Sequence, residues 1–202
     1  YTAAIHPDNE EFKAAVEKGI PMLTRAQLLG QIMENYKYSI AVSGTHGKTT
    51  TTSMLSYILI DADTDPTISV GGILDSIGGN IRVGKSEYFV TEACEYTNSY
   101  HAFKPFISII LNVDADHLDF FKDLNDIEQS FHKFAELVPN AGFVIANADN
   151  QGAMDSVAGL EHPVFTFGLE HPADCTAANL RDVDGAPSFD VMIRGKKYAH
   201  VT

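Results

Sequence analysis

A glycine-punctuated turn between a strand pattern and a helix pattern constrains the fold of this chain more than any other feature. The apolar, β-prone run at residues 38–42 leads into Gly44-Thr45-His46-Gly47-Lys48-Thr49-Thr50, and residues 53–59 then have the character of a helix. Glycines leave room for several backbone N–H groups to point at one anion, and the helix adds its positive N-terminal end. We therefore expect a phosphate-binding loop.

This loop differs in one respect from the common pattern of phosphate loops. The pattern G-x-x-x-x-G-K-[ST] would place a glycine at position 42, where Val42 stands, so the present loop is shorter. Lys48 is expected to reach the outer phosphates, and the Thr49 hydroxyl to hold Mg²⁺. The alternative, an ordinary glycine turn, is disfavoured because a strand pattern precedes the loop and a helix pattern follows it.

Composition narrows the range of partners. The 202 residues include 14 basic and 27 acidic ones, for a formal charge of −13. This balance argues against nucleic acid or an anionic membrane as partner, because both require basic patches. No apolar run approaches the length of a membrane span, and no signal peptide is visible. The chain starts at Tyr1 rather than Met, so we expect a piece of a longer protein.

The two cysteines show no metal-like spacing. Cys94 and Cys175 lie far apart in the sequence, which favours unpaired thiols in a reducing compartment. We therefore expect a cytoplasmic location.

Residues 1–37 are predicted to be the end of a preceding domain with a connecting helix. Asp8 or Asn9 caps a helix at residues 10–18, and Thr24 opens a second helix that reaches about residue 36. Residues 20–23 between them fit an extended segment or a short strand. Such elements cannot close a core alone, so residues 38–202 are predicted to form the next domain.

The rest of the chain predicts an α/β fold with a mostly parallel sheet flanked by helices. Apolar strand patterns at 67–70, 88–91, 106–112 and 142–147 are interspersed with helix patterns at 124–138 and 151–159. Residues 77–84 fit either an irregular hairpin or flap, or simple turns. Four short strand patterns at 164–167, 175–180, 188–193 and 198–201 have no helix between them, which predicts a small antiparallel sheet near the C-terminus.

Polar groups follow four of the apolar strands. In an open parallel sheet, ligands gather beyond the carboxyl ends of the strands, so we expect these groups to converge. They are Lys48 and Thr49, Glu92 and Glu95, the run from Asn112 to His117, and Asn147 with Asp149.

The chemistry of these side chains suggests their roles. Thr49 and Glu92 offer the hard oxygen ligands that Mg²⁺ prefers. His117 fits a second metal ligand, a group that orients the phosphoryl acceptor, or a hydrogen-bonded surface residue. Asn147 fits either a contact to a base edge or a turn former.

Three further acids have open roles. Glu95, Asp116 and Asp119 fit either outer partners of the metal ligands or a solvated acidic face.

At these positions the chain resembles the Mur ligases, the ATP-dependent amino-acid ligases of bacterial cell-wall synthesis. The phosphate loop, Glu92-Ala93-Cys94-Glu95, the run from Asn112 to Asp119 and Asn147-Ala148-Asp149 follow one another in the family's order. The resemblance implies the central P-loop type ATPase domain of a three-domain enzyme. It also implies that residues 4–31 end a UDP-binding domain, and that the last helix of the central domain and the amino-acid-binding domain are missing.

The resemblance further implies a reaction. ATP would phosphorylate the lactyl carboxylate of UDP-N-acetylmuramate, and the amine of L-alanine would attack the resulting acyl phosphate. His46 and the run Ala115-Asp116-His117-Leu118-Asp119 favour this pair of substrates within the family.

Family motifs also imply a role for each site residue. Lys48 would contact the phosphates, Thr49 and Glu92 the first Mg²⁺, and His117 the second. Asn147 would contact adenine, and His46 would lie near the sugar-nucleotide. The nucleotide-binding loop as a whole would be Gly44, Thr45, His46, Gly47, Lys48, Thr49 and Thr50. The family's carbamylated lysine is not assigned here, although His132-Lys133 lies in the corresponding helix pattern.

Two alternatives stay open. One is a related ligase with a peptide or folate acceptor, and the other is a nucleotide-binding module without chemistry. As a central-domain fragment, the chain is expected to be inactive as a ligase by itself.

Overall fold

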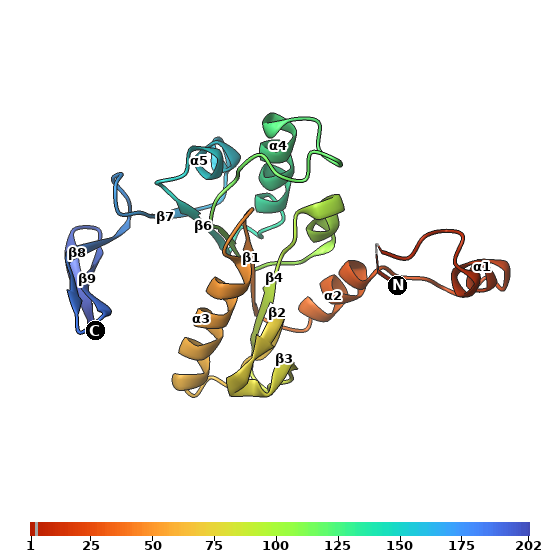
Figure 1. Cartoon of the computed structure of the whole chain (residues 1–202), viewed down its shortest axis with the longest axis horizontal. Helices are drawn as coiled ribbons and strands as arrows, with labels where there is room; N and C mark the ends of the chain where they lie inside the picture. Colours follow the sequence, from red (N-terminus) through yellow and green to blue (C-terminus); the bar gives the residue numbers. More distant parts are fainter. Residues whose placement is uncertain (3) are drawn as a thin grey trace.

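The computed structural model describes residues 1–2 and 4–202, and within them the strands form one 10-stranded sheet (Figure 1). The strands are β1 (Tyr38–Ser43), β2 (Thr67–Leu74), β3 (Gly79–Arg82), β4 (Tyr88–Glu92), β5 (Ile107–Ile110), β6 (Phe143–Asn147), β7 (Val164–Phe167), β8 (Cys175–Val183), β9 (Ala186–Ile193) and β10 (Lys196–Val201). Their order across the sheet is β10-β9-β8-β7-β6-β5-β1-β4-β2-β3.

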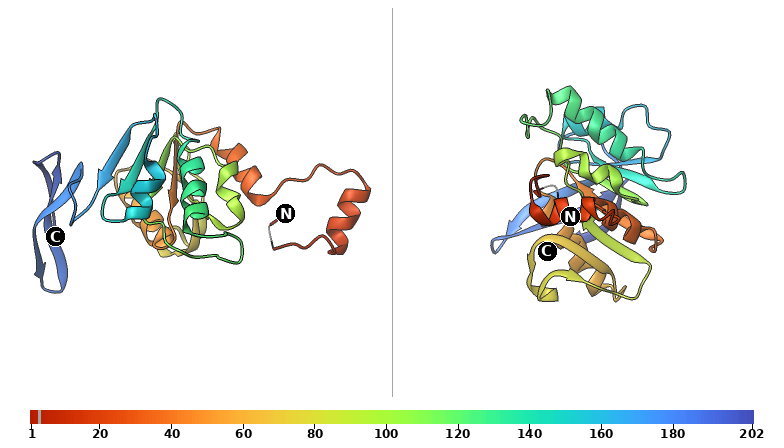
Figure 2. Two further views of the ribbon diagram at one scale, coloured as in Figure 1. Left: turned by 90° about the horizontal axis from the view of Figure 1, so that it is seen from above. Right: turned by 90° about the vertical axis from the view of Figure 1, so that its right-hand side faces the viewer.

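The helices are α1 (Glu10–Glu17), α2 (Arg25–Met33), α3 (Lys48–Asp61), α4 (Leu124–Ala135) and α5 (Gln151–Val157), with short 3₁₀ segments η1 (Asp75–Ile77) and η2 (Tyr96–Ala102). The N-terminal segment with α1 and the ribbon of β8, β9 and β10 lie at opposite ends of the molecule (Figure 2). None of the helices in the described part of the chain has the length and apolar character needed to cross a bilayer.

The sheet is mostly parallel, as the sequence predicts. Strands β2, β4, β1, β5, β6 and β7 pair in parallel, whereas β3 is antiparallel to β2 and the β8–β10 ribbon is antiparallel within itself. Helix α3 packs on the face that bears Ile68, and α4 and α5 pack on the face that bears Ala41 and Val144. The predicted α/β class with flanking helices is therefore confirmed.

The prediction for residues 164–167 is wrong in one respect. This segment was assigned to the antiparallel sheet, but β7 pairs in parallel with β6 and extends the main sheet. The reason is the crossover through α5. It returns the chain to the amino end of β6, so β7 runs in the same direction as β6. The antiparallel part consists of β8, β9 and β10, and it is continuous with the main sheet through the pair Phe167 and Cys175.

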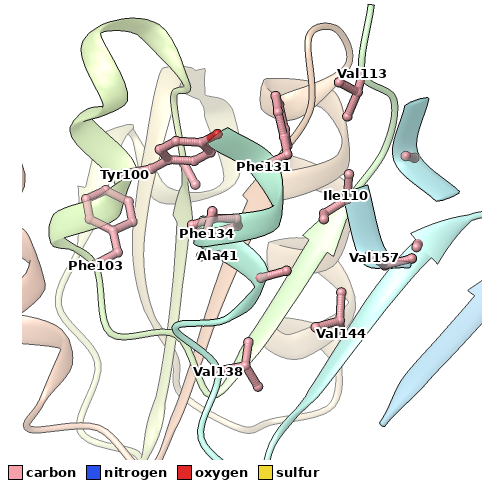
Figure 3. Close-up of a cluster of buried hydrophobic side chains, with 14 of the residues drawn as sticks. Ala41, Tyr100, Phe103, Ile110, Val113, Phe131, Phe134, Val138, Val144 and Val157 are labelled. Atoms are coloured by element: carbon pink, nitrogen blue, oxygen red, sulfur yellow. The ribbon is translucent and has the colours of Figure 1, made fainter. Parts of the chain in front are cut away.

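Three aromatic side chains form the centre of the core on the α4 face (Figure 3). Tyr100 stacks on Phe134 with ring centroids 4.6 Å apart, and it meets Phe131 edge-on at 5.5 Å. Ile127, Phe131 and Phe134 recur at helical spacing on α4. The Tyr100 hydroxyl shares a hydrogen bond with Ser130 at 2.8 Å, and burial raises the pKa of Tyr100. These contacts hold η2, which follows β4 in the chain, against α4.

The two N-terminal helices form where the sequence predicts them, although α2 ends at Met33 rather than near residue 36. The Asn9 side chain accepts from Phe12 N at the start of α1, and Thr24 with Gln27 forms a capping box on α2. Residues 20–23 form no strand within the described chain, although Tyr1 N donates to Leu23 O at 2.8 Å and Tyr1 O accepts from Arg25 N at 2.7 Å. A Cβ on Gly30 would lie 1.9 Å from Ala102 O, so this glycine lets α2 approach η2 closely.

Two further segments differ from the sequence patterns in extent. Helix α3 begins at Lys48, directly after Gly47, rather than near residue 53. Strand β2 runs through Gly71 and Gly72 to Leu74, and β3 pairs back on it, so residues 77–84 contain the hairpin alternative.

Candidate nucleotide-binding site

The loop between β1 and α3 has the backbone of an anion cradle. Gly44 has φ +144° and Gly47 has φ +83°, conformations that L side chains rarely adopt. A Cβ on Gly44 would also lie 3.0 Å from Leu111 Cβ and 3.2 Å from Asn112 N. Gly47 is the N-cap of α3 and supplies no side-chain cap. The first-turn N–H groups of α3 therefore remain available to a phosphate.

Residues that follow β5 hold this loop in place through hydrogen bonds. Thr45 N donates to Asn112 O at 3.0 Å, and His46 N donates to Asn112 Oδ1 at 2.8 Å. Asn112 Nδ2 returns a bond to His46 O at 3.0 Å, and Asp114 N donates to Thr45 Oγ1 at 2.9 Å. The sequence placed Asn112 in the polar run after the strand, but only the fold shows that it holds the loop.

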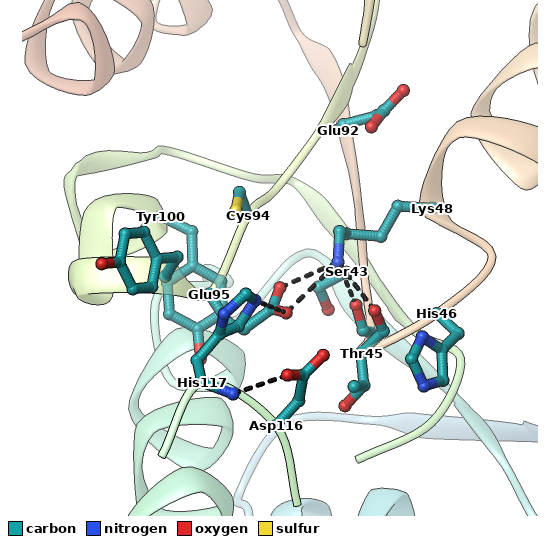
Figure 4. Close-up of polar contacts among 12 residues, drawn as sticks. Ser43, Thr45, His46, Lys48, Glu92, Cys94, Glu95, Tyr100, Asp116 and His117 are labelled. Carbon is teal, nitrogen blue, oxygen red and sulfur yellow. Dashed lines mark hydrogen bonds and ion pairs between the residues drawn. The ribbon is translucent and has the colours of Figure 1, made fainter. Parts of the chain in front are cut away.

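Lys48 lies with its ammonium group in the mouth of its own loop (Figure 4). Nζ donates to Gly44 O at 2.6 Å, to Thr45 O at 3.1 Å and to Glu95 Oε2 at 3.0 Å. The side chain is 16% exposed. The lysine predicted to contact phosphates thus stands beside the cradle that would receive them.

Thr49 and Glu92 come together beside this lysine. Thr49 Oγ1 donates to Glu92 Oε2 at 3.0 Å, and Gly71 N donates to Glu92 Oε1 at 2.6 Å. A Cβ on Gly71 would lie 2.9 Å from Glu92 Oε2, so a larger residue there would displace the end of the Glu92 side chain. A hydroxyl and a carboxylate side by side form a donor pair suited to Mg²⁺. Gly71 was missed as a site residue, although its place in Gly71-Gly72 after an apolar run is a signal for close backbone approach.

His117 contacts a different carboxylate. Its Nε2 lies 3.5 Å from Glu95 Oε1, and its backbone N donates to Asp116 Oδ1 at 2.7 Å. The Tyr96 ring lies 4.9 Å from the His117 ring, and the Tyr96 hydroxyl donates to Asp119 Oδ2 at 3.1 Å, which raises the pKa of Tyr96. Tyr96 was not predicted from the sequence.

The predicted ligand set therefore divides into two contact groups. Lys48, Glu95 and His117 form one, and Thr49 with Glu92 forms the other. Within the described residues no group of three or more His, Cys, Asp or Glu side chains has the geometry of a metal site. A metal contact by His117 stays a prediction.

Asn147 acts as a turn former. Its Nδ2 donates to Leu111 O at 3.0 Å, and its Oδ1 accepts from Asp149 N at 3.0 Å. Asp149 in turn accepts from the backbone of residues 169–171, and these bonds, chiefly from Leu169 N, lower the pKa of Asp149 to about 2. An adenine contact by Asn147 stays a prediction, as do roles for the exposed Thr50 and His46.

A cleft of about 810 Å³ adjoins Glu92. Cys94 and Tyr96 line it from one side, and α2 with the N-terminal segment lines it from the other. The carboxylate that partners Thr49 thus faces a space large enough for a second ligand.

Comparison with known families gives two matches along the chain. The profile of the Mur ligase middle domain matches residues 42–202, and that of the Mur ligase family, catalytic domain, matches residues 1–37. The UDP-N-acetylmuramate–L-alanine ligase of Caldanaerobacter subterraneus subsp. tengcongensis is 55% identical over 99% of this chain and 44% of the relative. The corresponding ligase of Agathobacter rectalis is 59% identical over 96% of this chain and 43% of the relative.

Solved structures agree with these matches. The UDP-N-acetylmuramate:L-alanyl-gamma-D-glutamyl-meso-diaminopimelate ligase from Neisseria meningitides superposes with a TM-score of 0.86 at 29% identity, over 98% of this chain and 65% of that one. The UDP-N-acetylmuramate-alanine ligase from Thermotoga maritima gives 0.82 at 27% identity, over 99% and 45%. The chain spans about 44% of the length of its curated relatives.

Proposed function

The chain belongs to the Mur ligase family, whose middle-domain profile covers residues 42–202, and from this premise we propose that it carries the ATP and Mg²⁺ site of a ligase that joins L-alanine to UDP-N-acetylmuramate. The observation that carries the proposal is the convergence of the uncapped start of α3, the Lys48 ammonium and the Thr49–Glu92 oxygen pair at the carboxyl ends of β1 and β4. The names of the relatives indicate the substrates.

The residues present fit a magnesium-bound triphosphate. The loop has glycine where a Cβ would strike Leu111, and α3 offers first-turn N–H groups without a side-chain cap. Thr49 and Glu92 would hold Mg²⁺, which offsets negative charge on the phosphates when bound. Lys48 would contact the transferring phosphoryl group and stabilise the charge that develops on it.

The reaction balances as two displacements. A carboxylate oxygen of the acceptor bonds to the γ-phosphorus of ATP while the bond to ADP breaks, giving an acyl phosphate. The amine of L-alanine then bonds to the acyl carbon, loses a proton, and expels phosphate to leave an amide. In both steps the protein mainly positions the reactants and stabilises charge. We assign His117 to the acceptor side or to a second metal.

The cleft beside Glu92 is the proposed place for the sugar-nucleotide. It lies between α2 and the residues that follow β4, so it joins the two segments that match separate family profiles. Residues 1–37 would then be the end of a UDP-binding domain, and residues 38–202 the ATP-binding domain. The active protein would work in the cytoplasm, where ATP is supplied, and this chain would bind nucleotide without completing the ligation.

Binding of a fluorescent ATP analogue with Mg²⁺ tests the nucleotide site. Lys48→Ala should weaken binding by about 10- to 150-fold, because hydrogen bonds from a charged donor are lost. Lys197→Ala, which removes a lysine of the distant β10 strand, should leave the affinity unchanged. Absence of binding to the wild type, or equal affinity in all three proteins, would overturn the proposal.

Phosphate release by a longer protein that includes this chain tests the acceptors. The expected result is release only when UDP-N-acetylmuramate and L-alanine are both present. Release with a peptide or folate acceptor instead would favour a related ligase. Full cellular function after Glu92→Ala would favour a module without chemistry.

A further inference from the structure

Glu95 is the most deeply buried acid at the site. It is 1% exposed and ranks among the largest fully buried side chains of the described residues. A buried carboxylate is costly unless charged partners and hydrogen bonds compensate it. Its partners are Lys48 Nζ at 3.0 Å and His117 Nε2 at 3.5 Å.

Glu95 and Glu92 differ in surroundings although only two residues separate them. Glu92 ends β4, is half-buried, and contacts Thr49 and Gly71. Glu95 is the N-cap residue of η2, and the chain has turned inward there. Figure 4 shows the two carboxylates on different sides of the Lys48 side chain.

The turn that buries Glu95 is firmly supported. Asn98 N donates to Glu95 O at 2.9 Å, and both Thr97 and Asn98 have positive φ. Ser130 Oγ bonds to Asn98 Oδ1 and to the Tyr100 hydroxyl, which joins the turn to α4. The backbone that carries Glu95 is therefore held in place by the core, and its side chain is buried there.

The three donors of Lys48 are all in use. An ammonium group has three N–H donors, and here they face Gly44 O, Thr45 O and Glu95. For Lys48 to bind a phosphate oxygen, at least one of these bonds must open. The incoming phosphates also bring negative charge toward a fixed carboxylate, which opposes their binding.

We propose that Glu95 is a positioning residue that latches Lys48 in its nucleotide-free place and thereby makes nucleotide binding depend on a divalent cation. The inference rests on the proposed function. The latch acts through Lys48: its negative charge disfavours bare phosphates, and a cation at Thr49 and Glu92 offsets that effect. His117 remains beside Glu95 when Lys48 turns to the phosphates, so the buried carboxylate keeps a partner.

The test compares the affinity for ATP in the presence of Mg²⁺ and of a chelator. Glu95→Gln keeps the shape of the side chain and removes its charge. The variant should bind metal-free ATP about tenfold more tightly than the wild type, while affinity for Mg²⁺–ATP changes by less than about threefold. The gain from adding Mg²⁺ should therefore shrink by about the same tenfold factor.

A matched control separates this effect from a change in net charge. Glu87→Gln also removes one negative charge, but Glu87 is exposed before β4 and lies 4.0 Å from the surface Lys37. Both of its affinities should equal those of the wild type. If Glu95→Gln binds metal-free ATP no more tightly than the wild type, or if Glu87→Gln shows the same gain, the inference is overturned.

A measurement on the unaltered chain covers the case in which Glu95→Gln does not fold. The NMR signal of the Lys48 ammonium group, assigned by its absence in Lys48→Ala, should exchange slowly with water in the nucleotide-free protein, because three acceptors hold it. Rapid exchange would overturn the latch. Failure of the wild type to bind Mg²⁺–ATP would overturn the proposed function as well. If the wild type binds Mg²⁺–ATP and Glu95→Gln has the wild-type affinity for metal-free ATP, only the latch is overturned.

Discussion

Two regions of the molecule place a carboxylate between a lysine and a histidine, but only one of them also has a glycine turn and a helix start beside the cluster. At the phosphate loop, Glu95 lies 3.0 Å from Lys48 and 3.5 Å from His117. In the β8–β10 ribbon, Asp190 lies 2.6 Å from both Lys197 and His200. The tighter cluster is thus in the ribbon.

In the ribbon cluster, both carboxylate oxygens of Asp190 have hydrogen-bond partners from the ribbon itself. Asp190 and His200 are cross-strand partners on β9 and β10, and Asn179 Nδ2 donates to Asp190 at 2.9 Å. The bond from Lys197, with those from Asn179 and His200, lowers the pKa of Asp190 below its usual range. Ser188 Oγ lies 3.4 Å from His200 Nε2, but Ser188 is 0% exposed, so it is closed to a substrate.

The difference shows what the residue types alone do not provide. At the phosphate loop, strand ends, a helix start and a glycine turn converge, so backbone donors and side chains face one point. In the ribbon the strands are antiparallel, and the cluster lies along the strands rather than at their ends. The three predictions below test this contrast, from the largest expected effect to the smallest.

The first prediction concerns the support beneath each region. Phe131→Ala should lower the free energy of unfolding by about 3–5 kcal/mol, because it leaves a cavity between α4 and the sheet. Tyr198→Ala on β10 should change it by no more than about 0.5 kcal/mol, since Tyr198 is 76% exposed. Urea unfolding followed by circular dichroism measures both. Equal losses would mean that the ribbon is packed as firmly as the core.

The second prediction uses two glycines with the same backbone conformation. Gly47 in the phosphate loop and Gly185 in the β8–β9 turn both have φ +83°, and a Cβ would meet no close contact at either position. Alanine at either site should cost about 1–2 kcal/mol of stability from backbone strain. Only Gly47→Ala should also weaken nucleotide binding, by about tenfold, because its methyl group stands at the start of α3.

Equilibrium unfolding and nucleotide titration on the same samples check this pair. Reduced binding in Gly185→Ala would show that the ribbon contributes to the site. Undiminished binding in Gly47→Ala would show that the start of α3 does not receive the phosphates.

The third prediction concerns the loop that joins the two regions. Asp149 has a pKa of about 2, below the usual value of about 3.9 for a free aspartate. Its stabilising effect is therefore complete above about pH 4 and is lost as the pH falls toward 2. Asp149→Asn should lower the Tm at pH 7 and flatten the dependence of Tm on pH between about 4 and 2. An unchanged acid slope in the variant would contradict the role assigned to Asp149.

Much of the fold could be predicted from local patterns. The spacing of Ile127, Phe131 and Phe134 predicts the buried face of α4, and Thr24 with Gln27 predicts the start of α2. The placement of β7 could not, because a four-residue apolar strand pairs equally well in either direction. Its direction follows from the α5 crossover, which is a property of the chain path.

The candidate site, like the fold, could be predicted in part from local patterns. Spacing in the sequence predicts the glycines of the loop, Lys48 and Thr49 as site residues. It also predicts that β4 ends at Glu92. Gly71 and Tyr96 were not predicted as site residues, because each contacts a residue distant in the sequence. Gly71 contacts Glu92, and Tyr96 contacts His117. Proximity of this kind is set by strand order.

By itself, the sequence determined the strand, turn and helix that cradle an anion and the kind of sheet that carries them, because these depend on glycine conformation and on the period of apolar residues. Only the tertiary structure decided that Glu95 is buried against Lys48, whereas Glu92, which the sequence already paired with Thr49, faces the Thr49 hydroxyl. The two acids are chemically alike, and their environments diverge because β4 stays paired with β1 as far as Glu92 while η2 turns into the α4 core.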